Sequence, residues 1–143
     1  MVWNIGENFP SLGIGHFIWY KAGEEAHFEE SFPGLVNFFV ANGIELPYIL
    51  KVHKSAPWPD RESFLRDRHN ISGQALLTFL EETKELQILY IYQRLVVALA
   101  KMEQQAKDPI ALRTKFYRVA AAENGLYALI DYVNFKGEGV NPN

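Results

Sequence analysis

The chain has 143 residues, of which 48% are hydrophobic and 22% are charged, and this length and composition are typical of one globular domain. The formal net charge is −3 and the basic residues form no tract, which argues against nucleic acid as a partner. The absence of cysteine excludes disulfides, thiolate nucleophiles and cysteine-ligated zinc. No apolar run reaches the roughly 20 residues that a membrane span needs, so no membrane span is expected.

The first part of the chain predicts a glycine-rich β-hairpin. Gly6, Pro10, Gly13 and Gly15 lie among apolar residues, a pattern typical of turns that connect short strands. We expect a strand over residues 15–20, followed by a polar loop over residues 21–30.

Helices are predicted for most of the chain after this hairpin. Ser31 occupies an N-cap position, and Asn42 with Gly43 is a typical helix end. The proline-rich segment 44–59 is expected to be irregular with one short helical turn. Asp60 then caps a helix that is expected to end at about His69.

The strongest helical pattern covers residues 72–106, with a break expected near Thr83. Apolar residues recur there at spacings of three and four, and those expected on the buried face are Leu76, Leu77, Leu80, Ile88, Ile91, Leu95, Leu99 and Met102. At about 1.5 Å per residue the second half is roughly 30 Å long, so it is expected to be the central helix.

Two further helices are predicted near the end of the chain. Asp108 caps a helix that begins at Pro109 and runs to about Ala122. After a break at Asn124 and Gly125, the helical spacing returns at Leu126, Leu129, Ile130 and Val133. The predicted fold is therefore mainly α, of class α+β, with a small hairpin near the N-terminus followed by about five helices around a long central one.

One candidate site lies in the hairpin turn Ser11-Leu-Gly-Ile-Gly-His16. Two glycines at i and i+2 allow the backbone to approach a ligand, while the Ser11 hydroxyl and the His16 imidazole can donate and accept hydrogen bonds. The same residues also suit a tight turn in a packed aromatic hairpin, in which His16 is structural. The pattern alone leaves both interpretations open.

A second candidate site lies on the last predicted helix. Spacings of four and three place Tyr127, Asp131 and Asn134 on one helical face, beside its apolar stripe. These side chains are candidates for ligand binding, and structural hydrogen bonds to a neighbouring element are the alternative.

Glu7 is the candidate general acid, because a carboxyl group beside aromatic walls is suited to that role. The glutamates of the loop over residues 24–30 are interpreted as solvated charges. The four histidines lack ligand spacing within any one element, so no metal site and no cofactor is expected. No Gly-x-Ser-x-Gly elbow and no phosphate-binding loop is present in the sequence.

Two segments resemble phage-type lysozymes. The stretch Ser11-Leu-Gly-Ile-Gly-His16 is similar to the Thr-x-Gly-x-Gly-His stretch in the β-hairpin that lines the sugar cleft of those enzymes. The stretch Ala128-Leu-Ile-Asp-Tyr-Val-Asn-Phe-Lys-Gly-Glu-Gly-Val140 is similar to their core helix. Over its full length the chain also resembles a bacterial family of uncharacterised proteins, through segments that include Phe9-Pro-Ser-Leu-Gly-Ile-Gly-His-Phe-Ile-Trp-Tyr20 and Pro57-Trp-Pro59.

The resemblance implies a lysozyme-like glycoside hydrolase or lytic enzyme that acts on peptidoglycan or a related amino-sugar polysaccharide. Ser11 matches the threonine that would hold the attacking water in an inverting glycosidase, and His16 matches the structural histidine of the motif. The general acid of those enzymes lies on a helix before the hairpin, and only residues 1–9 precede the motif here. The chain is therefore expected to be a fragment or core of a longer protein, truncated at both ends, and Glu7 is its only glutamate near the presumed cleft.

Trp19, Tyr20 and Trp58 are the expected sugar platforms, since sugar C–H faces pack against aromatic rings. One alternative is a non-catalytic lysozyme-like domain that binds glycan or protein and lacks the acid. Another is a structural domain whose aromatic residues all belong to the core.

A peptidoglycan substrate would imply a periplasmic or secreted protein, although no export segment is recognised in the sequence. The rings outside the helical stripes, which we expect at an open cleft, are Trp3, Phe9, Phe17, Trp19, Tyr20 and Trp58.

Overall fold

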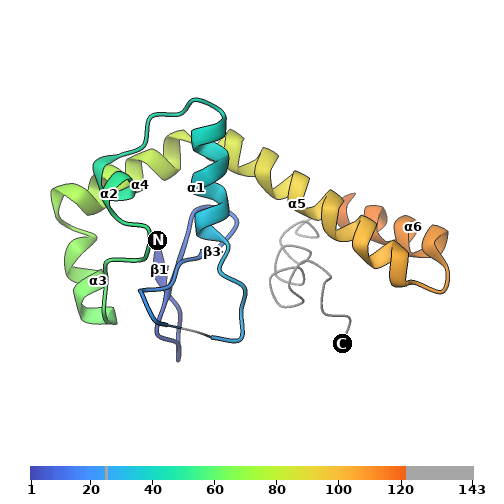
Figure 1. Cartoon of the computed structure of the whole chain (residues 1–143), viewed down its shortest axis with the longest axis horizontal. Helices are drawn as coiled ribbons and strands as arrows, with labels where there is room; N and C mark the ends of the chain where they lie inside the picture. The colour runs from blue at the N-terminus through green and yellow to red at the C-terminus, as the bar shows by residue number, and fades with distance from the viewer. Residues whose placement is uncertain (25, 122–143) are drawn as a thin grey trace. The chain divides into compact units, whose positions relative to one another are not determined.

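The computed structural model describes residues 1–24 and 26–121, and within these ranges the chain is mainly helical with one small antiparallel sheet (Figure 1). The three strands are β1 (Val2–Trp3), β2 (Pro10–Leu12) and β3 (Phe17–Ile18). The helices are α1 (Phe32–Ala41), α2 (Tyr48–Val52), α3 (Arg61–Asp67), α4 (Ile71–Glu82), α5 (Lys84–Gln105) and α6 (Pro109–Ala121). The predicted α+β class is confirmed.

The chain divides into two compact units. Within the described residues, unit 1 comprises Met1–Ala26 and Glu30–Ile88, and unit 2 comprises His27–Glu29 and residues 89–121. Unit 1 thus contains the sheet and helices α1 to α4, whereas α6 and most of α5 belong to unit 2. None of the helices in the described ranges has the length and apolar character required to cross a membrane.

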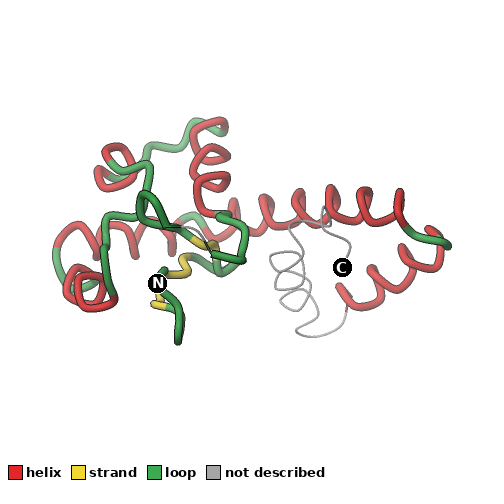
Figure 2. The backbone as a smooth tube through the Cα atoms, turned by 60° about the horizontal axis from the view of Figure 1, so that its bottom comes forward, coloured by secondary structure: helices red, strands yellow, loops and turns green. Residues whose placement is uncertain are grey.

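The sheet of unit 1 consists of very short strands joined by loops, as the yellow segments of Figure 2 show. Strand β2 is central and pairs antiparallel with both neighbours, so that Ser11 lies opposite Val2 on one side and Ile18 on the other. The strand expected over residues 15–20 is shorter in the structure. Strand β3 ends at Ile18, and the N–H of Tyr20 donates to the carboxylate of Glu30 (2.7 Å) instead of to a strand carbonyl.

Ser31 precedes α1 as predicted, but its hydroxyl does not cap the helix. The Ser31 Oγ instead accepts a hydrogen bond from the N–H of Ile18 (2.9 Å) and so joins α1 to β3. Asp60 and Asp108 do cap α3 and α6, since each carboxylate accepts from the N–H three residues later. The predicted helix end at Asn42 and Gly43 is confirmed, with Gly43 at φ +72°.

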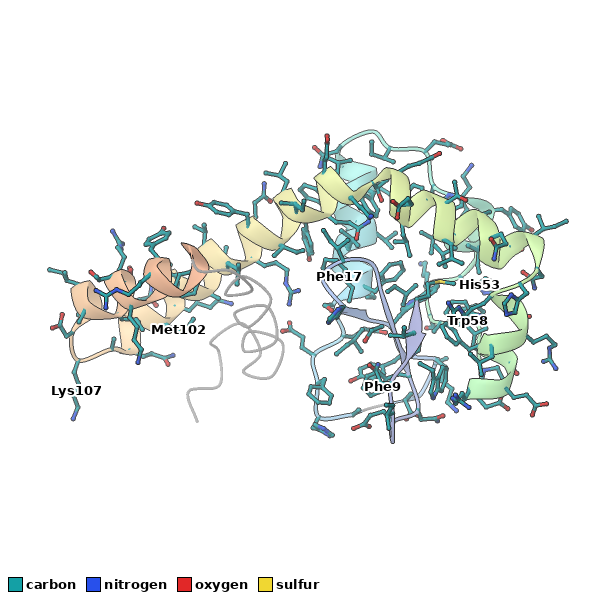
Figure 3. The ribbon with its side chains drawn as sticks, turned by 180° about the vertical axis from the view of Figure 1, so that it is seen from behind. Phe9, Phe17, His53, Trp58, Met102 and Lys107 are labelled. Atoms are coloured by element: carbon teal, nitrogen blue, oxygen red, sulfur yellow. The ribbon has the colours of Figure 1, made fainter. Side chains whose placement is uncertain are left out.

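Aromatic rings form much of the core of unit 1. Trp19 contacts Phe32 (centroids 4.9 Å apart) and Trp58 (5.6 Å), and Trp58 contacts Phe64 (5.1 Å). These tilted and edge-to-face arrangements are the favoured ones for aromatic pairs. Rings of this core that are at most 7% exposed include Phe9, Phe17, Trp19, Tyr20 and Trp58, three of which are labelled in Figure 3. The expectation that they line an open cleft is therefore wrong, because their faces pack against other side chains.

One buried amide joins the glycine turn of the hairpin to the junction of α4 and α5. The side chain of Gln87 is fully buried, and its Oε1 accepts a hydrogen bond from the N–H of Ile14 (3.0 Å). Its Nε2 donates to the carbonyl of Leu80 (2.7 Å) and to the hydroxyl of Thr83 (3.0 Å). Both ends of the amide are thus satisfied, as burial of a polar group requires.

The glycine at position 13 is explained by this contact. Gly13 has φ +72°, and a Cβ built there would lie 2.4 Å from the Oε1 of Gln87. An L side chain is therefore disfavoured twice, by the backbone conformation and by the lack of space.

Thr83 separates α4 from α5, which confirms the predicted break. Its hydroxyl donates to the carbonyl of Phe79 (2.8 Å) and accepts from Gln87. Gln87 lies on the buried face of α5. Ile91, four residues later on the same face, is also buried. Ile88 was expected inside but is 49% exposed, because Gln87 takes the inward position at this turn.

We predict that Gln87→Leu lowers the free energy of unfolding by about 2–4 kcal/mol, because the carbonyl of Leu80 and the N–H of Ile14 lose their partner. Urea unfolding followed by tryptophan fluorescence measures unit 1 selectively, since Trp3, Trp19 and Trp58 all lie in it. Glu85→Leu, at an exposed position of the same helix that also lies in unit 1, is the control. Equal effects of the two substitutions would contradict the structural role of Gln87.

Gly13→Ala and Gly23→Ala form a second matched pair. Both glycines have positive φ, so both variants are expected to lose about 1–2 kcal/mol from backbone strain. Only at Gly13 does the new methyl group meet another side chain, whereas nothing lies within 4 Å at Gly23. We expect Gly13→Ala to cost about 1–3 kcal/mol more than Gly23→Ala in the same unfolding measurement. Similar costs would show that the Gln87 contact does not restrict position 13.

Candidate functional site

The candidate site is a surface hollow of about 430 Å³ in unit 1. Its wall comes from the turn between β1 and β2 and from the first residue of α3, and consists of Trp3, Asn4, Ile5, Gly6, Glu7, Asn8 and Arg61. This volume lies within the usual range of small-ligand sites. Glu7 is the one predicted site residue in this wall.

Asn4 holds the turn between β1 and β2. Its backbone N–H and its side-chain Nδ2 both donate to the carbonyl of Phe9 (3.1 and 3.0 Å). Its Oδ1 accepts from the hydroxyl of Ser11 (3.1 Å), and its carbonyl accepts from the N–H of Glu7 (3.2 Å). Because Phe9 is buried, these bonds fasten the turn to the core.

Trp3 provides the aromatic surface of the hollow. Its Nε1 donates to the carbonyl of Glu7 (2.9 Å), and its ring packs against Phe64 with centroids 5.6 Å apart. The side chain is only half-buried, in contrast to Trp19 and Trp58. Trp3 is thus an outer ring of the aromatic core, held in orientation by one hydrogen bond and one ring contact.

The wall carries one carboxylate, from Glu7, and one guanidinium, from Arg61, beside the amide side chains of Asn4 and Asn8. Amides and charged groups around an aromatic ring can bind the hydroxyl groups and the C–H face of a sugar. Hydrolysis by most glycosidases uses two carboxylates across the scissile bond, and this wall supplies only one. The chemistry of the hollow therefore suits binding better than cleavage.

Arg61 is the first residue of α3, and it lines the hollow from this position. The carboxylate of Asp60 accepts from the N–H of Ser63 (2.8 Å) and caps the helix. The hydrogen bonds from Ser63, supported by the charges of Arg66 and Lys21, lower the pKa of Asp60 below its ordinary value. The cap is therefore an interaction of the ionised carboxylate.

The other catalytic candidate, Ser11, and the described residues expected to bind substrate lie outside this hollow. Ser11 is 7% exposed in β2, and its hydroxyl is engaged with Asn4. His16 is exposed in the glycine turn, where it has φ +51°. Trp19 is in the core and donates from Nε1 to the carbonyl of Lys54 (3.2 Å). Tyr20 and Trp58 are core residues as well, so these three rings offer no open face to a sugar.

Three predicted binding residues, Tyr127, Asp131 and Asn134, lie outside the described residues. Within residues 1–24 and 26–121, no group of three or more histidine, aspartate or glutamate side chains is arranged to hold a metal ion.

Sequence reasoning placed Trp3 among the rings expected at an open cleft, but it did not assign Asn4, Asn8 or Arg61 to a site. The glycine flanked by two asparagines at positions 4–8 is a turn signal that could have drawn attention to this loop. No local pattern could place Arg61 there, because tertiary packing brings α3 to the turn.

A second groove, of about 490 Å³, lies between the segment before α2 and the exposed side of α4. Its wall contains two glutamates and no basic residue, and the carboxylate of Glu45 is already paired with Lys51. Its one ring, Phe79, is buried, so this groove lacks the exposed aromatic surface that Trp3 gives the hollow.

No family model, no curated protein and no solved structure matches the chain, so the resemblance to phage-type lysozymes depends on the quoted residues alone.

The cap at Asp60 predicts a pH dependence. Because the folded-state pKa is lowered, the stabilising contribution is present above the unfolded-state pKa of about 4 and is lost as the pH falls through the lower folded-state value. Asn also caps helices but does not titrate in this range. Between about pH 5 and pH 2, the stability of unit 1 should therefore fall less in Asp60→Asn than in the wild type, as measured by urea unfolding. Parallel pH profiles would contradict this role for Asp60.

Proposed function

We propose that the chain is a non-catalytic, lysozyme-like binding domain for an amino-sugar polysaccharide such as peptidoglycan or a chitin-like polymer, and that the glycan binds in the hollow at Trp3. The observation that carries the proposal is the half-exposed Trp3 ring, whose orientation is fixed by Glu7 and Phe64 and which shares the wall with two amides. A preoriented ring loses little conformational entropy on binding.

Two observations favour binding over cleavage. The glycine turn of the lysozyme-like motif is engaged by Gln87, and the hydroxyl of Ser11 by Asn4, so these groups serve the fold. The wall of the hollow also lacks the second carboxylate that hydrolysis ordinarily requires.

The second candidate function is a glycoside hydrolase with Glu7 as its general acid. It is favoured by one observation, the position of Glu7 in the wall of the hollow. With either function, a peptidoglycan ligand would place the protein in the periplasm or outside the cell.

The binding proposal is tested by isothermal titration calorimetry with chitotetraose. We expect wild-type binding at millimolar sugar or below, and about fivefold weaker binding for Trp3→Ala, because a ring contact is worth about 1 kcal/mol. Asn8→Ala changes an exposed wall residue outside the core and should also weaken binding. Tyr48→Ala, which removes an exposed ring of α2 outside the hollow, is the control and should bind like the wild type. No heat of binding at millimolar sugar, or equal affinities for all variants, would contradict the proposal.

Loss of turbidity from a cell-wall suspension separates the two functions. The binding domain should leave the suspension unchanged. Clearing by the wild type that disappears in Glu7→Gln would instead establish the glycosidase.

A further inference from the structure

We infer that Arg61 makes the hollow selective for acidic glycans, in which a sugar carboxylate is available to its guanidinium, over neutral amino-sugar oligomers. The inference rests on the proposed function, and it assigns to one residue the choice between two classes of saccharide.

The guanidinium of Arg61 is available for a ligand. Within the described residues its side chain takes part in no hydrogen bond or ion pair, although it lines the hollow and is exposed. The neighbouring carboxylate of Asp60 is engaged with the N–H of Ser63, and the charges that act on Asp60 come from Arg66 and Lys21. Arg61 thus lines the hollow without a carboxylate partner among the described residues.

The rest of the wall determines how an acidic sugar would lie. A guanidinium can bind a carboxylate through two parallel hydrogen bonds, which a neutral hydroxyl cannot reproduce. The negative charge of Glu7 in the same wall repels a second carboxylate. An acidic glycan would therefore direct its carboxylate toward Arg61 and away from Glu7, with a sugar face against Trp3.

A matched pair of ligands tests this selectivity. Chitotetraose is a neutral oligomer of an amino sugar, and a hyaluronan tetrasaccharide has the same length but alternates the amino sugar with a carboxylate-bearing one. In calorimetric titrations of the full chain we expect the acidic tetrasaccharide to bind about tenfold more tightly at low salt. The difference should shrink as the salt concentration rises, because part of it is electrostatic.

Arg61→Gln should remove the preference, because it should weaken binding of the acidic tetrasaccharide about tenfold more than binding of chitotetraose. Arg66→Gln is the control, since it removes an exposed arginine of the same helix that does not line the hollow, and it should keep the preference. Fluorescence of the buried tryptophans checks that both variants are folded.

Each result is decisive. Equal affinities of the wild type for the two ligands, with both weakened by Asn8→Ala, would overturn the role of Arg61 and leave the proposed function standing. A preference that persists in Arg61→Gln would also overturn it. Failure of both ligands to bind would overturn the proposed function together with the inference.

Discussion

The amide of Gln87 makes three hydrogen bonds, and its partners belong to two parts of the chain that lie far apart in sequence. The carbonyl oxygen holds the glycine turn through Ile14, while the nitrogen holds the junction of α4 and α5 through Leu80 and Thr83. Because the amide is fully buried, loss of any partner leaves a polar group without water or a substitute. The positions of the hairpin turn and of the helix break in unit 1 are therefore set by the same side chain.

This constraint changes the meaning of the lysozyme-like motif. Gly13 is required because a Cβ there would meet the Gln87 oxygen, so Gly13 needs no ligand to explain it. Most of the rings around the motif are likewise used to fill the core. What remains for a ligand is the outer end of the aromatic cluster, where Trp3 lies beside Glu7 and Arg61. The functional proposal is therefore based on the hollow at Trp3 and not on the glycine turn.

Local signals predicted the helices well, because caps and helical spacing act within a few residues. Asp60, Asp108 and the break at Thr83 were placed correctly from such signals. Contacts between residues distant in sequence were not predictable in this way, and Gln87 and Ile14 are 73 positions apart. The polar Gln87 also occupies the buried position on α5 that was expected for the apolar Ile88. Of the residues in the hollow, only Glu7 and Trp3 were predicted. Arg61 was missed because tertiary packing brings it to the turn. Trp19, Tyr20 and Trp58 were wrongly expected at a cleft, because their burial depends on the whole core. The structure divides into two compact units. That residues 1–143 form one domain stays a prediction.

The central claim, that the side chain of Gln87 dictates the glycine turn, is tested most directly by a double-mutant cycle between Gly13→Ala and Gln87→Ala. Tryptophan-detected urea unfolding would give the free energy of each variant. Since removal of the Gln87 side chain also removes the atom that a Cβ at position 13 would meet, the account predicts that the double variant is more stable than the sum of the single effects implies. The expected coupling is about 1–3 kcal/mol. Additive effects, within about 0.5 kcal/mol, would contradict the account.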